Sequence, residues 1–283
     1  MPVPTTSRGN TRTLAQLKEH YIVEKELADR LRASSREDRM ELYASVYDEL
    51  YRRVPLHPQL TRKASARDTV WATTRQFRIL HRYLSKDITF LEVGAGDCSL
   101  SFAVARIVKK CYALDVSSEI SKSSAYPQNF ELILFDGCNV PLPSESVDIA
   151  YSNQVMEHLH PDDAREQLER ICRVLIRDGR YICVTPNRLT GPHDISKYFT
   201  EEASGFHLKE YTNMELDDLF RGVGFSKVEA HWALRGFSVR CPLHGLRLLE
   251  HTLQLLPHHV RKAVAHWIPV RVLLDHCYLV AEK

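Results

Sequence analysis

The 283-residue sequence lacks the features that mark several structural classes. No window approaches the ~18 consecutive apolar residues that a membrane span needs, and the first residues lack the apolar core of a signal peptide. Its 11 glycines and 13 prolines are too few for a fibrous or low-complexity chain. The seven cysteines are dispersed and never spaced as a C-x-x-C pair, which disfavours disulfide frameworks and zinc knuckles. We expect a soluble cytoplasmic protein with reduced, mostly buried cysteines.

Net charge is also small. The chain has 38 basic and 36 acidic side chains, a balance of +2 that is too weak to predict a nucleic-acid partner. The distribution is uneven, because residues 1–87 carry 17 basic and 11 acidic side chains whereas residues 88–283 carry 21 and 25. This asymmetry indicates two regions with different faces or partners.

Residues 1–87 have a helical pattern. Apolar residues recur at helical spacing from Leu14, again between Met40 and Tyr51, and a third time over residues 69–84. Ser35 followed by Asp38 resembles a capping box, which marks a helix start. We predict an N-terminal helical extension or lid over residues 1–87.

From residue 88 onward, short apolar runs alternate with helix-like segments, which is typical of βαβ units in a mostly parallel sheet. This pattern predicts an α/β domain over residues 88–283, with helices on both faces of a seven-stranded sheet. A helical insert is expected at 237–272, before the last strand. The expected strands are 89–93, 110–116, 130–135, 147–152, 180–185, 227–233 and 277–281, and the expected helices are 100–108, 118–123, 160–176 and 213–223.

The strongest chemical signal is a strand, a Gly-x-Gly turn and a helix start over residues 90–100. Gly94 and Gly96 allow the backbone to turn sharply and approach a ligand beyond the carboxyl end of the strand. A dinucleotide site would want Gly or Ala at the position of Ser99. Glu92 and Asp97 add negative charge, which suits a cationic cofactor better than a pyrophosphate.

Two aspartates end the next two expected strands. Asp115 follows Gly96 by 19 residues and is placed to accept hydrogen bonds from ribose hydroxyls, whereas Asp136 is placed for an exocyclic amine. Each could instead form an ordinary turn after a strand. Their register with the strands favours the ligand-binding interpretation.

Over residues 88–225 the chain resembles the class I S-adenosylmethionine-dependent methyltransferases, within them the methyltransferase type 11 group that includes ubiquinone-biosynthesis enzymes. The resemblance implies a Rossmann-like sheet of strand order 3-2-1-4-5-7-6 with an antiparallel last strand. It also implies S-adenosyl-L-methionine as cofactor, with its methionine part beside the glycine turn, its ribose at Asp115 and its adenine at Asp136. Cys98 departs from the family, which often has a third glycine there. The cofactor-binding residues implied are Glu92, Gly94, Ala95, Gly96, Asp115, Val116, Asp136, Gly137, Asn153 and Gln154.

Residues 152–163 resemble the group's motif after the fourth strand, which lies near the transferring methyl. His158 could be a general base, a hydrogen-bond donor that positions substrate, or a structural residue. Together with Glu157, His160, Asp162 and Asp163 it could also suggest a divalent metal. A helix start explains Pro161-Asp162-Asp163 better, so we expect no metal.

Two polar loops, 185–196 and 207–211, are expected at the same pocket mouth. They make His193 and His207 further candidates for a base, although they could be ordinary connections. The insert has a leucine stripe with a basic, histidine-rich rim. It could pack on the N-terminal helices to roof the pocket, form a homodimer, or lie on a membrane surface as a peripheral contact.

These features together predict S-adenosylmethionine-dependent methyl transfer to a small-molecule or glycan acceptor, with O-methylation favoured. A Thr-Pro-Asn-Arg and Gly-Pro-His-Asp pairing at residues 185–194 is similar to bacterial methyltransferases of polysaccharide and secondary-metabolite pathways. One alternative is a non-catalytic methyltransferase-like scaffold. A second is an NAD-dependent oxidoreductase, which Ser99 and the acidic turn disfavour.

Overall fold

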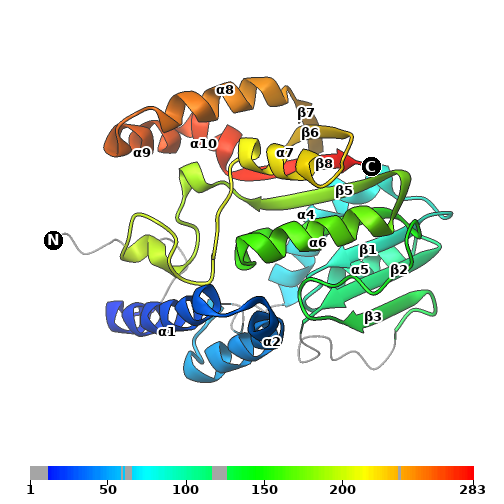
Figure 1. Ribbon diagram of the computed structural model, residues 1–283, viewed down its shortest axis with the longest axis horizontal. Helices are drawn as coiled ribbons and strands as arrows, with labels where there is room; N and C mark the ends of the chain where they lie inside the picture. The colour runs from blue at the N-terminus through cyan, green and yellow to red at the C-terminus, as the bar shows by residue number, and fades with distance from the viewer. Residues whose placement is uncertain (1–11, 59, 61–65, 117–125, 235–236) are drawn as a thin grey trace.

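The computed structural model describes residues 12–58, 60, 66–116, 126–234 and 237–283. Its centre is an eight-stranded sheet of order β3-β2-β1-β4-β5-β8-β6-β7 (Figure 1). Strands β1 to β5 pair in parallel, and β8 is antiparallel to both β5 and β6. The α/β architecture, the seven expected strands, their order and the antiparallel last strand are therefore confirmed. The strands are β1 (Thr89–Val93), β2 (Lys110–Asp115), β3 (Phe130–Leu134), β4 (Val147–Asn153), β5 (Leu175–Pro186), β6 (Lys227–Leu234), β7 (Phe237–Cys241) and β8 (His276–Glu282).

The eighth strand, β7, corrects the prediction that the insert is helical from residue 237. It pairs antiparallel with β6 and forms the edge of the sheet beyond it. The alternation Phe237-Ser238-Val239-Arg240-Cys241 has the period of a strand. Only the rest of the insert is helical.

Helices cover both faces of the sheet (Figure 1). Buried apolar residues form one cluster that includes Leu168 of α6 and Phe220 of α7, and a second that includes Leu80 of α4 and Val104 of α5. The expected helix at 118–123 lies outside the described residues. The helices are α1 (Leu14–Ala33), α2 (Arg36–Arg53), α4 (Ala66–Leu80), α5 (Ser99–Ala105), α6 (Pro161–Val174), α7 (Asn213–Gly222), α8 (Leu243–Gln254), α9 (His258–His266) and α10 (Ile268–Leu274).

The N-terminal helices share their core with the sheet. Leu27 and Leu31 of α1 and Leu50 of α2 are buried in the same apolar cluster as Val93 of β1 and Leu114 of β2. The side chain of Arg32 also donates to the backbone carbonyls of residues 204, 205 and 207. Helices α1 and α2 are therefore an integral layer of the domain and not only a cover placed on it.

The helical insert is fastened to α7. The buried carboxylate of Glu250 in α8 accepts hydrogen bonds from the Asn187 side chain at 2.7 Å, from the Asn213 backbone at 2.9 Å and from the Met214 backbone at 2.9 Å. Figure 1 shows α8–α10 and α1–α2 at opposite ends of the molecule, so the insert does not pack on the first two N-terminal helices. Residues of α10 and of the third N-terminal helix, α4, do line one cavity.

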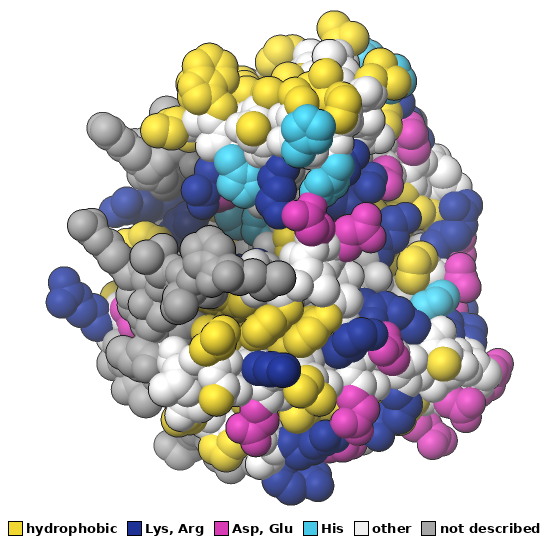
Figure 2. Space-filling view, turned by 90° about the vertical axis from the view of Figure 1, so that its left-hand side faces the viewer, with side chains coloured by type: hydrophobic (Ala, Val, Ile, Leu, Met, Phe, Trp, Pro, Cys, Tyr) yellow, Lys and Arg dark blue, Asp and Glu magenta, His cyan; other side chains and the backbone are white. Residues whose placement is uncertain are grey.

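The insert also exposes apolar side chains. Leu248, Leu255 and Ile268 are 69%, 72% and 76% exposed, and Figure 2 shows apolar side chains gathered at the top of the molecule with His, Lys and Arg beside them. No helix of the described residues is long and apolar enough to cross a membrane. Dimerisation and peripheral membrane contact through this surface stay predictions.

Candidate active site

A cavity of about 500 Å³ opens at the carboxyl ends of β1, β2 and β4. Its volume is within the range of small-molecule sites. Parallel strands aim their carboxyl ends at one edge of a sheet, and the loops that follow them supply the walls. Of the residues expected to bind a cofactor, nine line the cavity: Glu92, Gly94, Ala95, Gly96, Asp115, Val116, Gly137, Asn153 and Gln154.

The loop after β1 takes the conformation that its glycines allow. Gly94 and Gly96 have φ of 73° and 54°, and Cys98, where a third glycine is common in the family, has φ of 58°. Cys98 therefore adopts the left-handed conformation of a glycine at a cost of roughly 1–2 kcal/mol. A Cβ on Gly94 would collide with Val155, whereas one on Gly96 would meet no atom within 4 Å. The backbone at Gly96 thus faces open space.

Asp115 holds this loop in place. Asp115 is the last residue of β2, and its carboxylate Oδ2 accepts a hydrogen bond from the backbone N–H of Gly96 at 2.7 Å. Asp136, by contrast, is not among the described lining residues. Its carboxylate accepts from the backbone amides of Cys138 at 2.9 Å and Asn139 at 2.7 Å. Asp136 therefore has the turn-forming geometry, and its contact with adenine stays a prediction.

The cavity is acidic. Asp68, Glu92, Asp97 and Asp115 line it, and no Lys or Arg is among the described lining residues. Burial raises the pKa of Glu92 to about 8, although the Ser101 hydroxyl donates a hydrogen bond to this carboxyl group. A site of this charge favours a cationic ligand, because a nearby positive charge stabilises the ionised form of Glu92.

His158 lies in the cavity wall after β4. Its Nδ1 donates to the backbone carbonyl of Phe206 at 3.0 Å, which leaves Nε2 with the lone pair. Burial, followed by the positive charge of His207, lowers the pKa of His158 to about 3. The imidazole therefore stays neutral at physiological pH, and it can accept a hydrogen bond at Nε2 but is a weak base. This geometry disfavours the donor role that the sequence left open.

His193 and His207 are not among the described residues of the cavity wall. His207 donates from Nδ1 to Glu210 at 2.6 Å, and its ring contacts His158 edge-on. Burial opposes protonation, but the bond to Glu210 and the charge of Glu157 outweigh it and raise the pKa of His207 to about 9. His193 Nε2 lies 3.1 Å from both the Asn187 carbonyl and the Thr190 hydroxyl. The role of either histidine as a base therefore stays a prediction.

Comparison with known proteins accounts for this site. Residues 91–183 match the family described as methyltransferase domain. A probable S-adenosylmethionine-dependent methyltransferase of Mycolicibacterium smegmatis is 27% identical over 220 residues, covering 75% of this chain and 79% of the relative. Another, of Mycobacterium tuberculosis, is 30% identical over 194 residues, covering 66% of this chain and 64% of the relative.

Residues 91–183 form a class I S-adenosylmethionine-dependent methyltransferase domain of the type 11 group. Solved structures show the same fold at low sequence identity. A phosphoethanolamine N-methyltransferase of Haemonchus contortus has a TM-score of 0.57 at 15% identity, covering 88% of this chain and 50% of that one. A methyltransferase of Haloferax volcanii, solved in complex with the activator Trm112, has a TM-score of 0.52 at 15% identity, covering 77% and 94%.

The described residues of the methyltransferase fit its cofactor, S-adenosyl-L-methionine. The acidic wall suits a sulfonium and an ammonium group, and the open space over Gly96 allows close approach of a ligand to the backbone. Asp115 can accept hydrogen bonds from hydroxyl groups. The side-chain nitrogen of Gln154 is buried without a hydrogen-bond partner, so it can donate to a ligand.

Helices α2 and α4 supply a wall of residues that the sequence analysis did not single out as site residues. Tyr43, Tyr47 and Tyr51 of α2 and Thr73 and Gln76 of α4 line the cavity. The three tyrosines recur every four residues and so share one face of α2. This spacing was visible in the sequence, but an aromatic stripe on a helix more often packs in a core than against a ligand.

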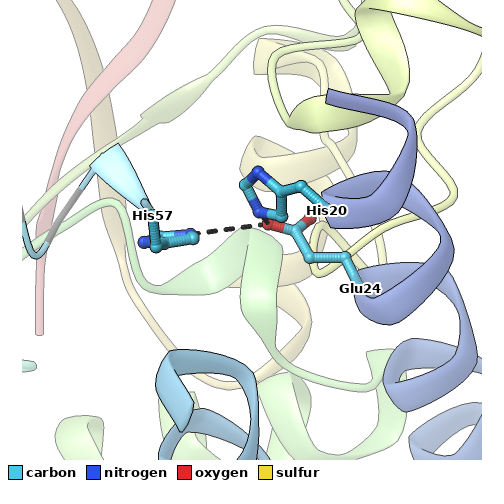
Figure 3. Close-up of side chains that lie close together, drawn as sticks. All are labelled: His20, Glu24 and His57. Carbon is cyan, nitrogen blue, oxygen red and sulfur yellow. Dashed lines mark hydrogen bonds and ion pairs between the residues drawn. The ribbon is translucent and has the colours of Figure 1, made fainter. Parts of the chain in front are cut away.

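Two groups of described residues have the composition of a metal site: His20, Glu24 and His57, and Glu157, His158 and His207. In the first (Figure 3), His20 Nε2 donates to Glu24 at 2.7 Å, and His57 Nε2 lies 3.6 Å from the same oxygen. Arg12 donates to His20 Nδ1, which fixes the proton on Nε2. A metal would need that nitrogen free, so the group acts as a hydrogen-bond network.

The second group also has other partners. The Glu157 carboxylate accepts from the Thr185 hydroxyl at 2.8 Å, while His158 and His207 donate to Phe206 and Glu210. The neighbouring residues 160–163 form a helix start, in which the backbone N–H of Asp162 donates to His160 Nδ1 at the first turn of α6.

Proposed function

We propose that this methyltransferase transfers a methyl group to a small-molecule or glycan acceptor, with a hydroxyl oxygen as the favoured site of methylation. The observation that carries the proposal is the acidic cavity in which Asp115 holds the Gly96 amide at the carboxyl edge of the sheet. When bound, S-adenosyl-L-methionine supplies an electrophilic methyl group on a sulfonium. Glu92, Gly94, Gly96 and Asp115 are the residues that would hold it.

The protein's main tasks are to bind, to align the acceptor and to exclude water, because an electrophilic methyl group needs little further activation. Tyr47 and Tyr51 close the cavity beside His158 with aromatic surface. The edge-on contact of Tyr47 with His158 holds the imidazole plane, and the Phe206 carbonyl fixes its tautomer. An acceptor hydroxyl could therefore donate its hydrogen bond to Nε2 and be oriented by it.

The decisive experiment incubates the purified protein with cofactor labelled in the methyl group and with extracts of small molecules and glycans. We expect label in an extracted acceptor and an equal amount of S-adenosylhomocysteine, and at a cofactor concentration near the wild-type Kd we expect Asp115→Ala to lower both. Binding of the cofactor without any transfer would favour the non-catalytic scaffold. Binding of NAD in its place would favour the oxidoreductase.

A further inference from the structure

A second cavity, of about 560 Å³, adjoins the cofactor cavity. The two share Ala72 and Gln76 of α4 together with Asn153 and Gln154 at the end of β4. The second cavity continues from there along the ends of β5 and β6 and under α10. A molecule bound in it would therefore reach the cofactor cavity past Asn153 and Gln154.

The second cavity carries the opposite charge to the first. Arg75 of α4 and Arg271 of α10 line it, whereas the cofactor cavity has carboxylates and no Lys or Arg among its described lining residues. Asp275 is the one carboxylate among the described residues of its wall, and it bonds His276 at 3.0 Å while Arg271 lies 3.8 Å away. The wall therefore keeps positive charge for an anionic ligand.

Apolar groups surround these charges. Trp71, Ile268 and Val272 line the cavity and are 66%, 76% and 58% exposed, and Trp232 and Tyr278 add further aromatic surface. Exposed apolar side chains that gather around a cavity mark a binding surface for an apolar ligand body.

The wall of the second cavity also contains two side chains with unsatisfied hydrogen-bond donors. The Nε2 of Gln154 and the Nε1 of Trp232 are buried, and neither has a hydrogen-bond partner among the described residues. Both atoms are donors. A ligand with acceptor oxygens would supply the hydrogen bonds that these two buried donors lack.

The geometry points to this second cavity as the acceptor site, and to an acceptor that combines an aromatic or other apolar body with an anionic group, a carboxylate or a phosphate. The assignment rests on the proposed function, because it takes the first cavity as the cofactor site. Opposite charges in adjoining cavities would keep the cationic cofactor and the anionic acceptor each in its own place.

The test uses two fluorescent probes with nearly the same aromatic body, anilinonaphthalene sulfonate and the neutral phenylnaphthylamine. Each is titrated into the full-length protein saturated with S-adenosylhomocysteine, so that the cofactor cavity is filled. We expect the sulfonate to bind more tightly. The double variant Arg75→Gln/Arg271→Gln should weaken sulfonate binding by roughly 5- to 20-fold and change binding of the neutral probe by less than about twofold.

Arg177→Gln is the matched control, because Arg177 is an exposed arginine near the amino end of β5, whereas the second cavity lies at the carboxyl end of that strand. It should leave both affinities unchanged. Displacement of the sulfonate by naphthoate, naphthyl phosphate and naphthamide then separates a carboxylate from a phosphate preference. Equal displacement by the neutral amide, or equal loss of sulfonate binding in Arg177→Gln, would overturn the proposal.

The proposed function and the acceptor site fail in different ways. If the function is wrong, cofactor binding or label transfer is absent whatever the probes do. If only the site is wrong, label transfer to the native acceptor continues and the KM for that acceptor is the same in the double arginine variant as in the wild type. A correct assignment raises this KM while the affinity for S-adenosylhomocysteine stays unchanged.

Discussion

Arg39 of α2 and Asp163 of α6 form a buried ion pair through two hydrogen bonds, of 2.6 Å from Nε and 2.7 Å from Nη2. The Tyr43 hydroxyl donates a third bond to the same carboxylate, at 2.7 Å. Both charged side chains are nearly inaccessible to solvent, so the pair fixes α2, and with it the tyrosines of the cavity wall, to the first turn of α6.

Asp163→Asn should therefore destabilise the protein strongly. It leaves the Arg39 guanidinium buried without a counter-charge, which costs about 3–5 kcal/mol. Urea unfolding measures this loss. The control is Arg36→Gln, which breaks the more exposed pair with Glu166 and should cost far less stability, because solvent screens that pair. Similar losses in the two variants would contradict the importance of burial.

The pair between Arg39 and Asp163 also makes the stability of the protein depend on pH in the acidic range. Burial raises the pKa of Asp163, but the bonds from Arg39 and Tyr43 outweigh it and hold the pKa below its ordinary value. The contribution of Asp163 is complete above the ordinary pKa of about 4 and is lost as the pH falls through the lower pKa of the folded state. The free energy of unfolding of Asp163→Asn should therefore fall less steeply than that of the wild type as the pH drops below about 4.

Asp115→Ala should weaken cofactor binding by roughly 10- to 150-fold, because hydrogen bonds to a charged group contribute about 1.5–3 kcal/mol. Calorimetry with S-adenosylhomocysteine measures the affinity, and thermal unfolding checks that the fold survives. Glu131→Gln is a suitable control, since this exposed carboxylate pairs with Lys110 on the surface. Equal affinity in Asp115→Ala and wild type would remove Asp115 from the cofactor site.

Cofactor affinity should rise with pH through Glu92. Its pKa is about 8 without a ligand, so the group is largely protonated at neutral pH. A bound cation favours the ionised form, and binding should then release a proton and strengthen by up to about tenfold per pH unit below that pKa. Calorimetry in buffers of different ionisation enthalpy detects the proton. Glu92→Gln should abolish the release, and a wild type that releases none would refute this role.

His158→Gln should lower turnover more than cofactor affinity, because the Nε2 lone pair is expected to orient the acceptor. Since the pKa of His158 is about 3, its titration should not appear in the pH dependence of kcat between about pH 5 and 8. Steady-state kinetics across that range provides both results. Unchanged turnover with a reduced Tm would show that the histidine is structural.

Deletion of residues 14–50 should unfold the domain and not merely open the site. Leu27, Val46 and Leu50 are fully or almost fully buried in the cluster that also holds Val93 and Leu114. Circular dichroism and calorimetry of the truncated chain measure this. A truncated protein that retains a cooperative transition and binds S-adenosylhomocysteine would show instead that α1 and α2 are a separable lid.

The sequence predicts the sheet well because each buried parallel strand is a short apolar run between polar loops. It predicts most of the cavity for the same reason, since Gly94, Gly96, Asp115 and Asn153 lie at or just beyond strand ends. Strand β7 was missed because its alternation is only five residues long and runs directly into the helical pattern of the insert. Its backbone hydrogen bonds to β6 stabilise the strand, and this pairing cannot be predicted from the local sequence.

The partners of two histidines could not be predicted from the sequence. His193 and His207 are in the polar loops expected at the carboxyl edge of the sheet. The Glu210 carboxylate accepts hydrogen bonds from the His193 backbone N–H and from the His207 ring, and so holds both residues within these loops. That partner follows from tertiary packing and not from spacing. The same holds for Arg75 and Arg271, which are 196 residues apart in the sequence and both line the second cavity.

The place of β8 in the sheet has a consequence for synthesis on the ribosome. It is translated after the other strands of the described residues, yet it lies between β5 and β6 and pairs with both. The β6–β7 hairpin can therefore join the sheet only after β8 leaves the exit tunnel. Until then β5 and β6 present unpaired edges, which are the usual starting points of aggregation. A ribosome that stalls before residue 276 should hold a chain that needs a chaperone.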